Sequence, residues 1–246
     1  MKLSIITVTY NAELTLLRTI QSVVNQTDER YEYILIDGAS RDATVDVAKK
    51  SGAFSIIISE RDGGLYDAMN KGLKYATGDY VCFLNAGDKF HDNKVVNTIL
   101  SIAEKNDMPD VVYGETDIVD SKGNFLYHRR LKAPKNLTWR SFEKGMLVCH
   151  QAFIMKRIKS PMYDLQYCFS ADYDWCIKCM KNADDLIFTN TILIDYLSEG
   201  VTTANRAASL KERFRIMVKN YGFIKVVFNH IGFAIRFLIA KINKQE

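Results

Sequence analysis

The segment FSIIISERDGGLYDAMNKGLKYATGDYVCFLNAGD, residues 54–88, decides the fold class, because its apolar spacing changes from strand to helix and back. Residues 54–59 are rich in β-branched side chains, which favour a strand, and residues 66–75 have the apolar spacing of a helix. Residues 80–84 are a second apolar run of strand length. A strand, a helix and another strand at this spacing predict a βαβ unit in a parallel sheet.

The same alternation extends over the first hundred residues. Further strands are predicted at residues 3–10 and 31–36, and further helices at 13–24, 43–50 and 93–104. Repeated βαβ units place helices on both faces of a parallel sheet, so we expect a doubly covered sheet in this half of the chain.

The pattern changes after residue 110. We expect a hairpin from strands at 111–119 and 124–130, a short helix at 139–144, a strand at 147–155, a helix at 171–182 with Ser170 as candidate N-cap, and a strand at 186–194. The predicted fold class is therefore α/β, with a nucleotide-binding βαβ sheet that continues into a mixed sheet. Helices are expected again from residue 209 to residue 242, interrupted by Gly222.

Composition excludes several classes of protein. A chain of 246 residues that is 48% hydrophobic and 25% charged is neither collagen, coiled coil nor a disordered polymer. Its five cysteines are an odd number in a chain too large to need disulfide bonds for stability. Because Met1 and Lys2 lead directly into a strand-like segment, we also expect no cleavable signal and a cytoplasmic location.

Charge is concentrated at the C-terminal end. Residues 206–246 carry nine Lys/Arg and two acidic residues, a net charge of +7, whereas the rest of the chain has a net charge of −3. A basic tail predicts an anionic neighbour, and no recognised motif or aromatic-interleaved basic face favours nucleic acid. Residues 223–242 are apolar almost all round but contain cationic residues throughout. We expect a helix that lies on a membrane without crossing it; the alternative is packing on the protein's own core or in a homodimer interface.

Polar residues follow four consecutive predicted strands. They are Thr9 to Asn11, Asp37, Asp62, and Asn85 to Asp88. Ligands of open α/β sheets bind beyond the carboxyl ends of the strands, so we expect these residues to converge on one rim. An acidic rim suits a phosphate carried by a divalent metal ion, and the sequence contains neither G-x-G-x-x-G after the first strand nor a P-loop. The alternative role for Asp and Gly after strands is to form turns.

Five stretches of the chain resemble the inverting glycosyltransferase family 2, whose nucleotide-sugar-binding fold is called GT-A. They are SIITVTYNAELTLLRTIQSVVNQT at 4–27, YILIDGASRDAT at 33–44, ISERDGGLYDAMNKGLKYATGDYVCFLNAGD at 58–88, CHQAFIMKR at 149–157 and FSADYDW at 169–175. The resemblance spans most of residues 2–200. It implies a nucleotide-sugar donor, usually linked to UDP or GDP, and a metal ion that bridges the diphosphate.

The resemblance also assigns residues to the donor. Thr9, Tyr10 and Asn11 match the first-strand segment that lies against the nucleoside. Asp37 matches the acid that receives the base, and Asp62 matches another acid of the donor rim.

The family's metal-binding segment, commonly Asp-x-Asp-Asp, reads Asn-Ala-Gly-Asp at residues 85–88. Only the last carboxylate remains, so the resemblance makes Asp88 the ligand for Mn²⁺ or Mg²⁺ and gives Asn85 a neutral oxygen. Asp172 matches the catalytic base, with Asp174 as the alternative if the register slips. A sugar hydroxyl is a poor nucleophile, so direct displacement at the anomeric carbon needs such a carboxylate. A second carboxyl group, as in glycoside hydrolysis, is not needed when a metal stabilises the leaving diphosphate.

Two further features have a structural and a functional interpretation. His150 and Gln151 are candidates for reaching the metal or the acceptor, although a lone histidine is more often structural. Cys176 and Cys179 have the spacing of half a zinc site, but a core helix is the favoured interpretation because the sequence has no second CxxC.

The sequence thus predicts an inverting glycosyltransferase of the bacterial surface-polysaccharide (cell-envelope) type, peripheral on the inner face of the membrane. It would move a sugar, UDP-linked by preference, to a hydroxyl of a glycan or lipid-linked acceptor. Residues 1–205 are expected to form the GT-A domain, with a donor half at 1–110 and an acceptor half at 111–205, and residues 206–246 to form basic amphipathic helices. The alternative is an inactive GT-A scaffold or nucleotide-sugar-binding component of a membrane glycan-assembly complex. A nucleotidyltransferase is disfavoured because no Gly-rich basic loop follows Tyr10.

Overall fold

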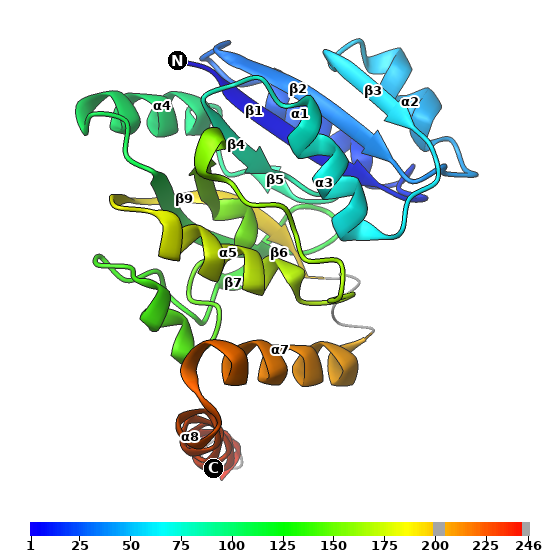
Figure 1. Ribbon diagram of the computed structural model, residues 1–246. Helices are drawn as coiled ribbons and strands as arrows, with labels where there is room; N and C mark the ends of the chain where they lie inside the picture. The colour runs from blue at the N-terminus through cyan, green and yellow to red at the C-terminus, as the bar shows by residue number, and fades with distance from the viewer. Residues whose placement is uncertain (199–204, 243–246) are drawn as a thin grey trace.

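The computed structural model describes residues 1–198 and 205–242 (Figure 1). Within these residues, nine strands form one sheet in the order β3-β2-β1-β4-β8-β6-β9-β5, with β7 paired to β6. The strands are β1 (Leu3–Thr9), β2 (Tyr31–Asp37), β3 (Ile56–Ser59), β4 (Tyr80–Phe83), β5 (Lys89–Phe90), β6 (Val111–Val119), β7 (Phe125–His128), β8 (Phe153–Lys156) and β9 (Leu186–Leu197).

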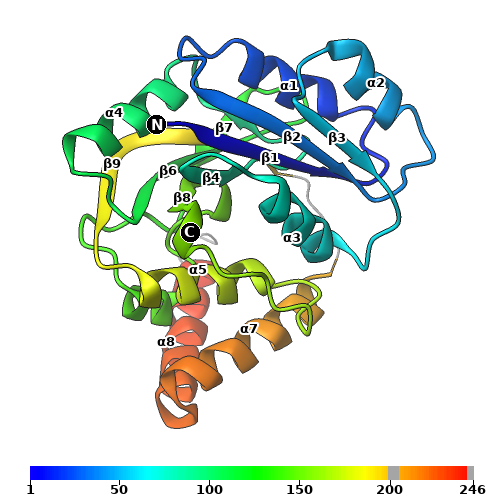
Figure 2. The ribbon, with the colours of Figure 1, turned by 45° about the horizontal axis from the view of Figure 1, so that its top comes forward.

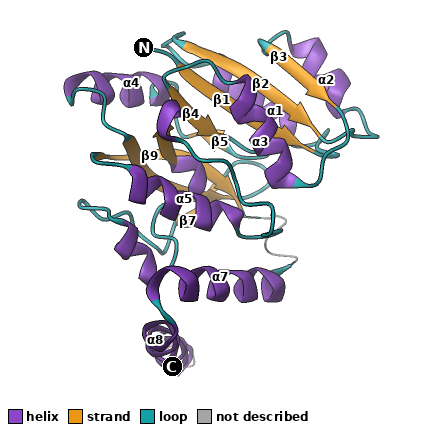
Figure 3. Cartoon of the chain, in the orientation of Figure 1, coloured by secondary structure: helices purple, strands orange, loops and turns teal. Residues whose placement is uncertain are grey.

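Helices cover both faces of this sheet, as Figure 3 shows by colour. The α-helices are α1 (Leu16–Val24), α2 (Thr44–Ser51), α3 (Leu65–Tyr75), α4 (Val95–Lys105), α5 (Ala171–Asn182), α7 (Arg206–Tyr221) and α8 (Phe223–Ile242). Three short 3₁₀ helices, η1 (Trp139–Lys144), η2 (His150–Ala152) and η3 (Arg157–Lys159), lie between β7 and α5. The turned view in Figure 2 places α1 and α2 on one face and α3 and α5 on the other.

The first half of the sheet is parallel, as predicted. β1 lies between β2 and β4 and runs parallel to both, and β2 is parallel to β3. All seven residues of β1 are buried, which is the pattern of a strand covered by helices on both faces. The carboxyl ends of these four strands therefore meet at one edge of the sheet.

The second half is mixed, which confirms the predicted change of pattern. β8 is antiparallel to β4 and to β6, whereas β6 and β9 are parallel to each other. The strand expected at 147–155 is wrong in its bounds: residues 150–152 form η2, and the strand begins only at Phe153. β5, a two-residue strand antiparallel to β9, was not predicted.

Ser170 is the N-cap residue of α5, as predicted, but its side chain makes no capping hydrogen bond. Instead the hydroxyl groups of Ser170 and Ser209 lie 3.0 Å apart, and this contact joins α5 to α7. In the same helix Cys176 and Cys179 are completely buried, as expected of a core helix.

The C-terminal helices lie at the far end of the molecule from β1, β2 and β3 (Figures 1 and 2). α8 packs on η1 through an ion pair of 2.7 Å between Lys225 and Glu143 and through a hydrogen bond of 3.3 Å from Asn229 Nδ2 to the carbonyl oxygen of Glu143. In the part of the chain that the structure describes, no helix is long and apolar enough to cross a membrane. The boundary between a domain at 1–205 and a tail at 206–246 stays a prediction.

Candidate active site

A cavity of about 920 Å³ opens at the carboxyl edge of the parallel strands. Six of the residues predicted from the sequence line it: Thr9, Tyr10, Asn11, Asp62, Asn85 and Asp88. Arg41, Arg61, Tyr196 and Leu197 are among the other lining residues. Segments that are far apart in the sequence therefore converge on one rim, as the position of their strands predicted.

The loops after β1 and β2 are fastened to each other. Asn11 and Ala39 both have positive φ angles, 51° and 59°, which side chains other than glycine rarely adopt. The Asn11 amide donates a hydrogen bond to the Ser40 hydroxyl (2.8 Å), and Asn11 Oδ1 accepts one from the Arg41 amide (2.9 Å). Strained backbone that is held by such bonds is common at binding sites.

Asp37 lies beneath the rim and is completely buried. Its carboxylate accepts hydrogen bonds from the Thr9 hydroxyl (2.9 Å), the Ser59 hydroxyl (2.7 Å) and the Ser40 amide (2.9 Å). These bonds join the ends of β1, β2 and β3, and Asp37 is not among the residues that line the cavity. Contact between Asp37 and a base stays a prediction.

The Asp62 carboxylate lies directly against Gly38. A Cβ atom on Gly38 would lie 2.5 Å from Asp62 Oδ2, closer than any such contact allows. The other carboxylate oxygen of Asp62 accepts a hydrogen bond from the Gly64 amide (2.9 Å), at the start of α3. The ends of β2 and β3 therefore approach each other closely at this point.

Asp88 is buried in the wall of the cavity and is held by two distant groups. Gln151 Nε2 donates to its Oδ2 (2.6 Å) and the Leu197 amide donates to its Oδ1 (2.8 Å). Burial raises the pKa of Asp88 to about 7, and these two hydrogen bonds oppose the rise. Nearby, the buried Asn85 Oδ1 has no hydrogen-bond partner in the described structure. A buried carboxylate beside an unpaired carbonyl oxygen is a donor set that fits a hard divalent cation.

A second group of metal-ligand side chains lies elsewhere. Among the described residues, His91, Asp117 and Asp195 have ligand atoms within 4.8 Å of one another, and Asp88 does not belong to this group. The sequence interpretation did not include these three residues.

Asp172 lies next to the cavity rather than in its wall. The Tyr66 hydroxyl donates to Asp172 Oδ1 (3.1 Å), and no described residue donates to Oδ2. Burial, followed by the negative charges of Asp88 and Asp172 among others, raises the pKa of the Tyr196 phenol. Leu65, which precedes Tyr66 in α3, lines the cavity, so the hydrogen bond from Tyr66 keeps Asp172 close to the cavity wall.

The two remaining candidates are engaged in the protein core. Asp174 is buried and forms an ion pair of 2.5 Å with Lys178, one helical turn further on. His150 is buried too, with its Nε2 atom 2.5 Å from the Tyr163 hydroxyl and its ring stacked on Phe83. These contacts favour the structural interpretation of His150.

The buried His150 should make stability depend on pH. Burial lowers its pKa from 6.5 to about 4, and the charge of Asp172 opposes this shift only in part. The unfolded chain therefore binds a proton below pH 6.5 that the folded chain does not bind until about pH 4. We expect His150 to cost about 3 kcal/mol of unfolding free energy as pH falls through this window. Denaturant unfolding at several pH values from 7 to 4 measures it. In His150→Gln the total loss of unfolding free energy over this window should be smaller by that amount, and an equal loss would contradict the assignment.

Sequence reasoning missed several residues of the site. Arg41 and Arg61 line the cavity, and neither guanidinium has an ion-pair partner among the described residues. Tyr196 comes from the second half of the chain. The arginines could have been found from their positions shortly after β2 and β3, whereas nothing in the local sequence indicates Tyr196 as a neighbour of Asp88. Gln151 was not missed: the sequence made it a candidate for reaching the metal, and its side chain contacts Asp88.

The chain has relatives of known name. The family model described as "Glycosyl transferase family 2" matches residues 4–160. A PGL/p-HBAD biosynthesis glycosyltransferase of Mycobacterium bovis (strain BCG / Pasteur 1173P2) is 32% identical over 187 residues, which are 73% of this chain and 70% of the relative. The amylovoran biosynthesis glycosyltransferase AmsB of Erwinia amylovora is 28% identical, over 72% of this chain and 64% of its own.

Solved structures of similar shape include TarS of S. aureus. Its residues 1–349 superpose with a TM-score of 0.73 at 16% sequence identity, covering 95% of this chain and 72% of that chain. The same protein in complex with UDP-GlcNAc gives a TM-score of 0.69 at 17% identity, over 93% and 73% of the two chains. At this identity the likeness shows a shared fold.

Proposed function

Because the chain belongs to glycosyltransferase family 2, we propose that it moves a sugar from a nucleotide-diphosphate donor, UDP-linked, to a hydroxyl of a glycan or lipid-linked acceptor. Its relatives are glycosyltransferases, and the fold is the GT-A type expected from the sequence. The proposal rests on the cavity at the strand ends. Two acidic residues, Asp62 and Asp88, and two basic residues, Arg41 and Arg61, line it together. The arginines would attract the negative charge of a donor diphosphate, and the aspartates would attract a metal cation.

The donor would be bound by side chains on the rim. Tyr10 is 64% exposed at the end of β1, so its ring is free to stack on a base. Arg41 and Arg61 offer planar guanidinium groups that match phosphate oxygens in geometry. Support for a uridine nucleotide comes from TarS, whose structures contain UDP and UDP-GlcNAc.

A divalent ion, Mn²⁺ or Mg²⁺, would be held by Asp88 and Asn85, because the first supplies a carboxylate and the second an oxygen with no other partner. When bound, such an ion stabilises the negative charge of a leaving diphosphate. Gln151 and Leu197 fix the Asp88 carboxylate in the wall of the cavity.

Asp172 would act as the base. Tyr66 holds one of its oxygens, which leaves Oδ2 to accept the proton of an acceptor hydroxyl as that oxygen attacks the anomeric carbon. One displacement inverts the configuration at that carbon.

Thermal-shift measurements test the donor. The melting temperature should rise with UDP more than with GDP, and more in the presence of Mn²⁺ or Mg²⁺, because a ligand that binds only the folded state stabilises it. Transfer or slow hydrolysis of UDP-sugars should accompany binding. Binding without any turnover would favour an inactive nucleotide-sugar-binding scaffold, and no response to any nucleotide would contradict the proposal.

We also propose that the C-terminal helices hold the enzyme on an anionic membrane surface. On α8 the apolar Ile224, Phe228 and Ile231 recur at helical spacing and are 73%, 69% and 51% exposed. This face lies opposite the one that packs on η1, and the tail carries a net charge of +7. Apolar side chains beside basic ones favour binding at the membrane interface.

A flotation assay tests the tail. The full chain should float with vesicles of anionic lipid and be released by high salt, because the surface attraction is screened. Ile224→Ser with Phe228→Ser should reduce flotation strongly without affecting the fold, since both side chains are exposed. Leu14→Ser, at a 91% exposed leucine near α1, is the matched control. Full-length protein that stays unbound would leave α8 as a packing element or a dimer contact.

A further inference from the structure

A row of charged side chains crosses four neighbouring strands outside the donor cavity. Lys89 of β5 is directly opposite Asp195 of β9, Asp195 is opposite Asp117 of β6, and Asp117 is opposite His128 of β7. Residues directly opposite each other in a sheet project from the same face. His91 follows Lys89 by two residues and reaches the same row.

The side chains of this row are in direct contact. His91 Nδ1 lies 2.7 Å from Asp195 Oδ1, and Lys89 Nζ lies 2.8 Å from Asp195 Oδ2. At the other end, His128 Nδ1 lies 2.7 Å from Asp117 Oδ1. The two aspartates are almost inaccessible, with side chains 6% and 8% exposed for Asp117 and Asp195.

The charges of the row do not balance. Two carboxylates face one ammonium group, so the row has a net charge of −1 while its histidines are neutral. Like charges directly opposite each other on neighbouring strands are destabilising, and buried carboxylates need a compensating cation. A divalent ion would turn this repulsion into coordination.

Three side chains of this row have ligand atoms close enough together to hold one metal ion. We propose that His91, directly after β5, Asp117 of β6 and Asp195 of β9 bind a divalent transition-metal ion of the zinc class, because their ligand atoms lie within 4.8 Å of one another. An imidazole nitrogen with two carboxylate oxygens suits Zn²⁺, whereas Ca²⁺ and Mg²⁺ prefer oxygen ligands alone. His128 holds Asp117 in place from outside the set, a role that metal sites commonly give to a hydrogen-bonded neighbour.

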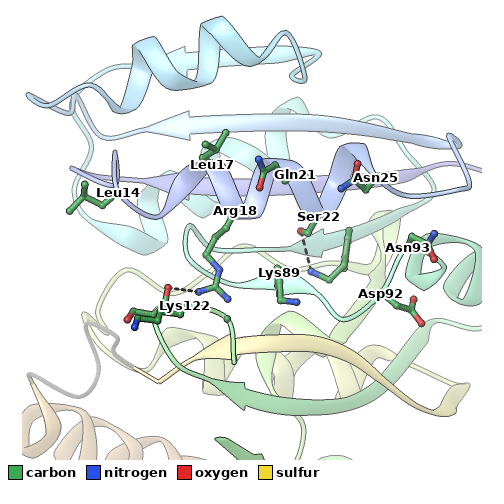
Figure 4. A pocket seen from close by; sticks show the side chains of 13 residues that line it. Leu14, Leu17, Arg18, Gln21, Ser22, Asn25, Lys89, Asp92, Asn93 and Lys122 are labelled. Atoms are coloured by element: carbon green, nitrogen blue, oxygen red, sulfur yellow. Dashed lines mark hydrogen bonds between the residues drawn. The ribbon is translucent and has the colours of Figure 1, made fainter. Parts of the chain in front are cut away.

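This site is separate from the donor cavity. None of the three proposed ligands is among the residues that line that cavity. Figure 4 shows Lys89 beneath α1 in a neighbouring pocket of about 610 Å³. An ion bound by the three ligands would tie β5, β6 and β9 together two residues before Leu197, whose amide holds Asp88.

Zinc binding without nucleotide tests this site independently of the proposed function. The background is the full chain with Asp88→Asn and Cys168→Ser, which removes the donor carboxylate and the exposed thiol. Equilibrium dialysis should give one Zn²⁺ per chain. His91→Ala should weaken zinc affinity at least tenfold, the smaller end of the effect of losing even an outer partner of a metal ligand. His230→Ala, a histidine of α8 remote from the row, should bind zinc as the background does.

Lys89→Met should change zinc affinity in the opposite direction to His91→Ala. It removes the ammonium group that competes for Asp195 and leaves the three ligands in place, so zinc affinity should rise. Circular dichroism confirms that each variant is folded. No zinc uptake by the background, equal affinity in His91→Ala, or weaker affinity in Lys89→Met would overturn the site and leave the row as a set of ion pairs.

Discussion

Replacing Asp172 with Asn should lower the rate of sugar transfer by roughly 100- to 10,000-fold, the usual cost of losing a general base. The amide keeps the shape of the carboxylate and can still accept the hydrogen bond from Tyr66. It cannot accept the proton of the acceptor hydroxyl at neutral pH. Because Asp172 does not line the donor cavity, donor affinity should be nearly unchanged. The rate is measured as kcat with donor in excess, and the donor affinity is measured as the Kd of UDP by calorimetry.

Asp174→Asn is the matched control, two residues further along α5. Its carboxylate is buried in an ion pair with Lys178, so the change should lower stability without removing a base. A large loss of turnover per folded molecule in Asp174→Asn, with Asp172→Asn active, would exchange their roles. If Asp172→Asn loses nucleotide affinity as strongly as turnover, then Asp172 belongs to the donor site. A product with retained anomeric configuration would exclude the single displacement.

Asp88→Ala should abolish the effect of Mn²⁺ on donor binding. Asp88 is the only carboxylate of the Asn85–Asp88 segment, and no second acid of that segment can replace it. UDP should bind the variant with the same affinity with and without Mn²⁺, through the remaining groups of the rim such as Arg41. Titration calorimetry of UDP at several Mn²⁺ concentrations gives this dependence directly.

Asp92→Ala is the control for Asp88→Ala. Asp92 is an exposed acid four residues further along the chain and outside the donor cavity, so the response to Mn²⁺ should persist. If Asp88→Ala keeps both the metal response and turnover, then another group holds the ion. Loss of the response in Asp92→Ala as well would point to a general change in charge rather than to a metal ligand.

The sequence was most informative where spacing alone determines structure. The four parallel strands and the helix at 171–182 follow from apolar periodicity, and the helix bounds agree with α5. β5 could not be predicted, because two residues carry no periodicity and pair with β9 only through the tertiary fold. Likewise η2 interrupts an apolar run whose pattern predicts a strand. This turn of helix brings the Gln151 side chain within hydrogen-bond distance of Asp88.

The candidate site was predictable as a rim but not in its details. Strand ends converge for topological reasons, so Tyr10 and Asp62 could be placed there from sequence. Whether a side chain at a strand end faces the cavity or the core is decided by the next layer, and Asp37 faces three hydroxyl and amide donors instead. The position of Asp172 depends on the hydrogen bond from Tyr66, which is distant in sequence and carries no local signal.

The two groups that hold Asp88 lie 63 and 109 residues after it in the chain. During synthesis on the ribosome, at about 5–20 residues per second, the Leu197 amide is made roughly 5 to 20 s after the carboxylate it binds. A nascent chain that already contains the first four strands therefore still has Asp88 without its partners. The part of the cavity wall that Asp88 forms is therefore fixed in place only after the second half of the chain has been made.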